Sequence, residues 1–159
     1  MHARVADLVA FYRQVQAERM QGIPLLHPGL WVEAVGFRLA GADGDEAVAE
    51  GVLLTPWFMS LVRLPLAVQP AAGRVGRKRV LAFGGECFEF IGAHDPALGF
   101  HEACALFSPM GDFRDQAQAR DTAEAVLAAL RTPAAVPAAA ASAPARRAFL
   151  LGRRAGAGR

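Results

Sequence analysis

The sequence contains little cysteine and no long apolar run, and each shortage excludes a class of protein. Its two cysteines, Cys87 and Cys104, allow at most one disulfide and do not form a CxxC pair, which excludes disulfide-rich secreted domains and zinc fingers. No apolar run reaches the roughly 20 residues that a membrane-spanning helix needs. The first helical segment contains Arg4, Asp7 and Arg13, which a signal peptide would not. We therefore expect a reduced, cytoplasmic protein without direct membrane insertion.

What the chain does contain is enough apolar material for one folded domain. It has 159 residues, of which 53% are hydrophobic and 20% are charged, which excludes a disordered or collagenous protein. The net charge of +2 is too small for the whole chain to be an obvious nucleic-acid binder. The charge is unevenly spread, because residues 131–159 hold six arginines and no acid, which leaves 11 basic and 15 acidic residues in 1–130. The body is therefore mildly acidic and the end of the chain is strongly basic.

The composition changes sharply near residue 132. Residues 132–145 are almost entirely alanine and proline, and the prolines interrupt any helix that the alanines would favour. We predict a single domain over residues 1–131, an Ala/Pro-rich linker over 132–145 and an Arg-rich tail over 146–159. The tail contains an apolar Phe-Leu-Leu run between two arginine pairs, so it is either solvated or docked on the body or on a partner.

The apolar periodicity predicts an α+β fold, in which an antiparallel strand meander is flanked by an N-terminal and a C-terminal helix. The pair Asp43-Gly44 is typical of a hairpin turn, and Asp112 is a candidate cap for the final helix. Pro65 should confine its strand to a sheet edge or a bulge. The predicted helices are 3–20 and 113–131, and the predicted strands are 31–40, 47–55, 59–68, 80–83, 86–92 and 100–107.

No constellation of catalytic or metal-binding residues is evident. The four histidines are not at metal-ligand spacing, and the chain lacks GxSxG and GxGxxG motifs. The basic stretch from Arg74 to Arg79 has no interleaved aromatic residues, which argues against single-stranded nucleic acid as a ligand. Cys87 and Cys104 are either structural thiols or a reversible redox pair. We therefore predict no catalytic residues, no metal and no cofactor, and we keep the thiol pair as the alternative.

Two proline-containing turns carry an unusual concentration of large apolar residues. Residues 55–59 read TPWFM and residues 108–113 read SPMGDF. The alternation of a strand cannot bury three consecutive large side chains on one face. Methionine and aromatic residues together make adaptable surfaces for binding peptides. These residues are either core or an exposed binding patch.

Taken together, several segments resemble the HybE/HupJ family of nickel–iron hydrogenase assembly chaperones. This chain departs from the family at Gly84-Gly85, where the family often has Pro-x-Gly. Some relatives are joined to a rubredoxin, but this chain has no CxxC pair and cannot hold the iron site of one. The matching segments are LLHP (25–28), GVLLTPWFMSLVRLP (51–65), the stretch 83–90, LFSPM with the following DF (106–113) and RRAFLLGRR (146–154).

The resemblance implies a non-enzymatic accessory protein for an uptake hydrogenase. Such a protein would hold a hydrogenase subunit precursor, either the large subunit or the small subunit with its twin-arginine signal, before export. A holding role needs a preformed apolar surface rather than a nucleophile, and the acidic body could attract the arginines of the signal. The alternative is a thiol-based redox accessory protein using Cys87 and Cys104. We predict a client-binding groove formed by Pro56, Trp57, Phe58, Met59, Pro109, Met110 and Phe113, with His27 and Pro28 nearby.

Overall fold

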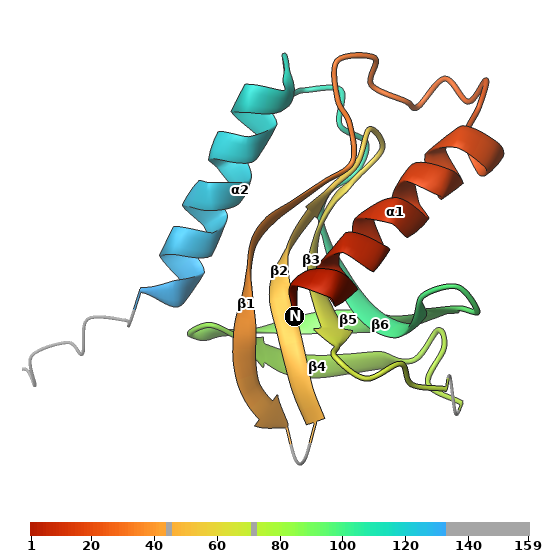
Figure 1. Cartoon of the computed structure of the whole chain (residues 1–159). Helices are drawn as coiled ribbons and strands as arrows, with labels where there is room; N and C mark the ends of the chain where they lie inside the picture. The colour runs from red at the N-terminus through yellow and green to blue at the C-terminus, as the bar shows by residue number, and fades with distance from the viewer. Residues whose placement is uncertain (44–45, 71–72, 133–159) are drawn as a thin grey trace, which may run out of the picture.

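The computed structural model describes residues 1–43, 46–70 and 73–132. It shows a six-stranded antiparallel sheet with the strand order β1-β2-β3-β6-β5-β4, with one helix on each side (Figure 1). The predicted α+β class is therefore confirmed. The helices are α1 (His2–Arg19) and α2 (Gln116–Arg131), and the strands are β1 (Glu33–Asp43), β2 (Glu46–Leu54), β3 (Met59–Pro65), β4 (Lys78–Phe83), β5 (Glu86–Asp95) and β6 (Gly99–Phe107).

The strand order is not a simple meander. Strands β1 to β3 follow one another, and so do β4 to β6, but β3 pairs with β6, so that β4 lies at the far edge of the sheet. The prediction that Pro65 confines its strand to a sheet edge or a bulge is wrong, because β3 is central and the irregularity in its pairing with β6 lies at Met59 and Ser60. Proline is tolerated there because Pro65 is the last residue of β3 and lies beyond the Arg63↔Glu102 pair that ends the described pairing with β6.

The two helices pack on opposite faces of the sheet (Figure 1). Helix α1 packs through Leu8 against a cluster that includes Ala49, Val62 and Leu64. Helix α2 packs through Ala123 and Leu127 against a larger cluster, which also includes Leu61, Phe83 and Phe90. Because this second cluster joins residues from β2, β3, β4 and β5 around one helix, the sheet curls around it, and the α2 side is the concave face.

Helix α2 begins later than predicted and has a different cap. Its N-cap is Asp115, whose carboxylate accepts a hydrogen bond from the Gln118 amide at 2.8 Å, and not Asp112. Phe113 does not enter the helix, because its ring packs against Phe107 with ring centroids 5.2 Å apart. At the other end of α2, the carbonyl of Leu130 accepts a hydrogen bond from the Gly85 amide at 2.8 Å.

Gly84 has a φ of 63°, and a Cβ at this position would collide with the Leu130 carbonyl. The glycine pair at 84–85 thus allows the close approach of α2 to the β4–β5 turn. The predicted linker after Thr132 and the predicted tail lie outside the described residues, as does the tip of the Asp43-Gly44 hairpin. Of the helices in the described ranges, neither is long and apolar enough to cross a membrane.

Candidate functional site

Three loops meet at one end of the sheet, which we call the loop end. They are residues 20–32 between α1 and β1, residues 55–58 between β2 and β3, and residues 108–115 between β6 and α2 (Figure 1). Each loop comes from a different part of the chain, so the loop end exists only in the folded protein. It contains both of the proline turns that the sequence singles out.

His27 ties the three loops together. Its amide donates to the carbonyl of Pro56 at 2.9 Å, and its Nε2 lies 2.7 Å from the carbonyl of Phe113. Since a carbonyl only accepts, Nε2 carries the proton and donates, and Nδ1 is then free to accept from the Gly29 amide at 3.1 Å. Both ring nitrogens of a neutral imidazole are thus satisfied. His27 is a structural brace of the loop end.

The TPWF turn is held by the hydroxyl of Thr55. This oxygen accepts from the amides of Phe58 at 2.9 Å and Trp57 at 3.3 Å, and it donates to the Phe58 carbonyl at 3.0 Å. The hydroxyl of Ser108 also donates to the Trp57 carbonyl at 3.5 Å. The next peptide bond, Ser108–Pro109, is cis. The two proline turns are therefore connected to each other as well as to His27.

The nine predicted client contacts all lie at the loop end, but they differ in accessibility. Met59 and Met110 are fully buried beneath α2, and Pro56 and Phe113 are buried as well. These four are packing residues, so they do not line an open groove. Phe58 is half-buried against the α1 side of the sheet. The predicted residues with accessible surface are Pro28 and Pro109, which are exposed, and Trp57 and His27, which are half-buried.

Two residues that the sequence-based prediction left out add exposed apolar surface to the loop end. Leu25 is 59% exposed and Trp31 is 51% exposed, although both are large and apolar. A shallow pocket of about 280 Å³ opens at Leu25, and three of the predicted residues, His27, Pro28 and Pro109, line it. Its lining is Pro24, Leu25, Leu26, His27, Pro28, Pro109 and Gly111. The LLHP segment was the available signal, because it places two leucines beside a proline.

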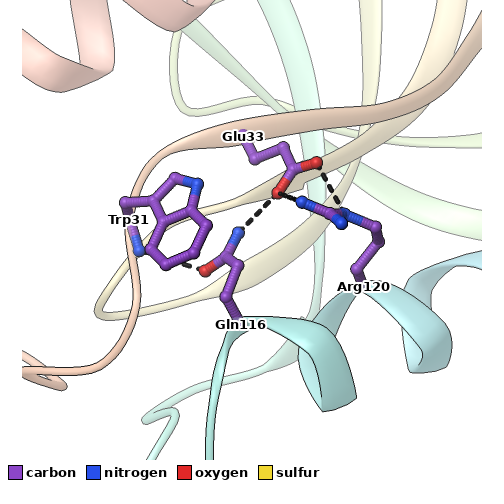
Figure 2. A network of polar contacts seen from close by, with 4 residues as sticks. All are labelled: Trp31, Glu33, Gln116 and Arg120. Carbon is purple, nitrogen blue, oxygen red and sulfur yellow. Dashed lines mark hydrogen bonds and ion pairs between the residues drawn. The ribbon is translucent and has the colours of Figure 1, made fainter.

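A polar network holds Trp31 in place (Figure 2). Its amide donates to Oε1 of Gln116 at 3.1 Å, and Nε2 of Gln116 donates to Glu33 at 2.7 Å. Arg120 donates to both carboxylate oxygens of Glu33, at 2.8 and 2.9 Å. Burial acts to raise the pKa of Glu33, but the hydrogen bonds from Arg120 and Gln116 outweigh it and lower that pKa. The network joins the start of β1 to the start of α2, so the backbone of Trp31 is fixed while half of its side chain faces solvent.

The two cysteines do not form a pair. They lie in the neighbouring strands β5 and β6, where Ile91 pairs with Ala103. This register places Cys104 beside Phe90, which is three residues from Cys87. The two cysteines are therefore separated by about 10 Å along the strand direction. A disulfide needs Cα atoms less than about 7 Å apart. Burial also raises the pKa of the Cys104 thiol, which disfavours the reactive thiolate. The arrangement gives the redox alternative no support.

The described residues contain no metal centre either. Within residues 1–43, 46–70 and 73–132, no three or more histidine, cysteine or acidic side chains are placed to hold a metal ion. His101 is buried, and its Nε2 lies 3.1 Å from the hydroxyl of Tyr12. Burial lowers the pKa of His101, so the neutral ring is favoured. Among the described residues, what this end of the molecule offers is a braced apolar surface.

Comparisons with known proteins agree with this description. The family model described as NiFe-hydrogenase assembly, chaperone, HybE matches residues 3–152. The chain is 41% identical over 165 residues to Protein HoxT of Cupriavidus necator, covering 95% of this chain and 89% of that protein. It is 40% identical over 126 residues to Probable rubredoxin HupJ of Rhodobacter capsulatus, covering 79% of this chain but 44% of that protein.

A solved structure shows the same fold. The solution structure of HybE from Escherichia coli superimposes with a TM-score of 0.55 and covers 96% of this chain and 91% of that one. Its sequence identity of 21% makes this a likeness of fold alone. The family model, in contrast, spans nearly the whole chain and confirms the resemblance noted in the sequence. The chain therefore belongs to the HybE family of NiFe-hydrogenase assembly chaperones.

Proposed function

We propose that this protein is an accessory chaperone that binds a precursor of a nickel–iron uptake hydrogenase subunit in the cytoplasm, before export. One observation carries the proposal beyond family membership: the loop end exposes Leu25, Trp31 and Pro109 on a framework that is already hydrogen-bonded. Exposed large apolar residues that cluster around a pocket are typical of interaction sites.

The framework matters as much as the apolar surface. His27, Thr55 and the Glu33 network fix the loops that carry the exposed residues. A preformed surface loses little conformational entropy when a partner binds, so more of the contact energy remains as affinity. The polar groups of these loops serve the framework, because both ring nitrogens of His27 and the hydroxyl of Thr55 are engaged in hydrogen bonds within the protein.

The client is proposed to be the large subunit precursor, the small subunit precursor with its twin-arginine signal, or both. An apolar segment of either subunit would bind against Leu25 and Trp31. For the signal peptide, the loop that precedes α2 adds the exposed carboxylates of Asp112 and Asp115 beside the apolar surface. Arginine–carboxylate pairs are strong and directional, so they would orient a twin-arginine segment.

The proposal is tested by affinity purification of the tagged protein from cells that make hydrogenase, with and without the large-subunit gene. We expect an unprocessed large or small subunit to be recovered. Loss of the small subunit when the large-subunit gene is absent would show that it is captured indirectly. Recovery of neither precursor from cells that still mature hydrogenase normally would contradict the proposal.

A further inference from the structure

A second feature lies on the concave face, away from the loop end. In register across four neighbouring strands, Arg38 pairs with Glu50, Glu50 pairs with Arg63, and Arg63 pairs with Glu102. Arg79 of β4 then reaches Glu102 at 3.1 Å. Positive and negative side chains thus alternate in one row across the sheet, and directly opposite strand residues of unlike charge attract. The proposed client surface uses none of these residues.

Both acids of this row and its central arginine, Arg63, are buried, whereas the two outer arginines are exposed. Glu50 and Glu102 are buried, and Nε of Arg63 lies 2.9 Å from Oε1 of Glu50. The side chain of Arg79, in contrast, is 47% exposed, against 10% for its partner Glu102. Arg38 is exposed as well. The glutamates therefore orient the guanidinium groups from below, and the surface that solvent meets is positive.

Two further arginines approach the same row. Arg74 lies over the ring of Phe100, 4.1 Å from its centroid, and donates to Oε1 of Gln69 at 2.6 Å. Arg131, from the end of α2, donates to the backbone carbonyl of Glu50 at 3.0 Å. Its Nε is buried without an acceptor in the described part of the chain. Burial and the nearby Arg38 lower the pKa of Arg131, as expected where positive charge is crowded.

The charge of this region is opposite to that of the rest of the domain. Residues 1–132 contain 12 basic and 15 acidic residues, yet five of the 12 bases and only two of the 15 acids gather here. A positive cluster on an acidic body is not explained by composition. It indicates a ligand that carries negative charge.

The cluster lines a groove rather than a flat surface. One cavity of about 220 Å³ is lined by Arg63, Arg74, Arg79, Glu102 and apolar Val48, Pro65 and Phe100. A second, of about 360 Å³, is lined by Arg38, Leu39, Ala40, Gly41, Glu50, Arg63, Ala82 and Gly84. Arg63 lines both cavities. We call them together the charged groove. The second cavity joins β1 and β4, the two edges of the curled sheet.

We propose that the charged groove binds an acidic peptide segment, with its carboxylates on Arg38, Arg79 and Arg74 and its aliphatic parts on Val48, Pro65 and Ala40. Guanidinium groups bind carboxylates in a bidentate manner, and the mixed polar and apolar lining suits side chains with short methylene stems. Strands β1 and β4 lie at sheet edges, where an extended segment can add backbone hydrogen bonds.

Two other occupants fit the groove less well. The chain's own tail over 146–159 carries five arginines and no acid, so the groove repels it. A single-stranded nucleic acid would need an open aromatic face on which to stack, but the ring of Phe100 is buried beneath Arg74. An acidic peptide uses the charge without requiring stacking.

The test is fluorescence anisotropy with a labelled octaglutamate peptide, using the full-length protein. An octaglutamine peptide and a single-stranded oligonucleotide of matched length serve as alternative probes. We compare wild type with the double variant Arg38→Glu/Arg79→Glu, and with Arg13→Glu on the exposed side of α1 as a control that reverses one charge away from the groove. Thermal unfolding and far-UV circular dichroism establish that each variant is folded. Because the probe is synthetic, the result does not depend on the identity of the hydrogenase client.

The expected result is that octaglutamate binds more tightly than octaglutamine, that the double reversal weakens it by about tenfold or more, and that Arg13→Glu changes it less than about twofold. If the double variant fails to fold, Arg79→Gln alone is used, with an expected loss of about threefold. Equal binding of octaglutamate and octaglutamine would overturn the proposal. So would equal weakening by the Arg13 control, or tighter binding of the oligonucleotide.

Discussion

The concave face of the sheet has two halves of opposite character: one is apolar and covered by α2, and the other is charged and open to solvent. Along β3, the side chains on this face are Met59, Leu61 and Arg63, so a single strand passes from the apolar half to the charged half. The apolar half is covered by α2 and is largely buried. The charged half extends past the helix and opens into the charged groove. The same inward-facing alternation therefore produces a core where a helix covers it and an open groove where none does.

The convex face of the sheet does not divide in this way. Ala49, Val62 and Leu64 occupy it along β2 and β3, and α1 covers them. These neighbours of Glu50 and Arg63 in sequence are apolar and lie on the convex face. The buried charges are therefore confined to the concave face at this level of the sheet. Four changes test this comparison, and they follow from the largest expected effect to the smallest.

Arg63→Met should have the largest effect on stability. Arg63 is buried beside Glu50, so removing its charge leaves a buried carboxylate with fewer partners, which costs about 3–5 kcal/mol. Urea denaturation measures the loss. In the double variant Arg63→Met/Glu50→Met, much of the stability should return. If Arg63→Met alone is neutral, the charged half is not an organised network.

Met110→Ala tests the apolar half, and it separates a core residue from a client contact. Met110 is fully buried, so the variant should lose about 2–5 kcal/mol of unfolding free energy. The matched control is Leu25→Ala at the exposed surface, where the expected loss is below about 1 kcal/mol. Equal losses in the two variants would mean that the division between core and exposed surface at the loop end is wrong.

Glu33→Gln tests the network that joins β1 to α2. The folded-state pKa of Glu33 lies below its unfolded value, so the carboxylate stabilises the fold above the unfolded pKa. This contribution disappears as the pH falls through the folded-state pKa. The melting temperature of the variant should be a few degrees lower than that of wild type at neutral pH, with the difference shrinking below about pH 4. A difference that grows on acidification would contradict this sign.

The smallest effect is expected for the double variant Cys87→Ser/Cys104→Ser. The thiols are too far apart to pair, and Cys87 is exposed. Hydrogenase maturation in cells should be unchanged within the error of an activity assay. Loss of maturation in a variant that retains its melting temperature would revive the thiol-based alternative.

Much of the fold was predictable from local patterns. Apolar patterns and turn residues placed all six strands to within a few residues. The order of the strands was not predictable, since nothing local records that β6 inserts beside β3. The cap at Asp115 was missed because Asp112 precedes the same helix and is also a good capping residue.

The site was predictable in place but not in detail. The proline turns do mark the loop end, yet Met59 and Met110 are buried there, while Leu25 and Trp31 provide exposed area. Sequence shows that a residue is apolar, whereas its accessibility depends on whether α2 covers it. The charged groove was hidden for a related reason. Glu50, Arg63 and Glu102 are single charges in apolar strands, and only the register brings them into one row.

The central claim is that the exposed residues of the loop end bind a hydrogenase subunit precursor. The most direct test measures how much unprocessed precursor is captured by tagged wild type, by Leu25→Asp and by Val68→Asp. Val68 is a matched control, because it is 68% exposed, against 59% for Leu25, and does not line the pocket of the loop end. The account predicts that Leu25→Asp captures at least about tenfold less precursor at an unchanged melting temperature, while Val68→Asp captures as much as wild type. Undiminished capture by a folded Leu25→Asp variant would contradict it.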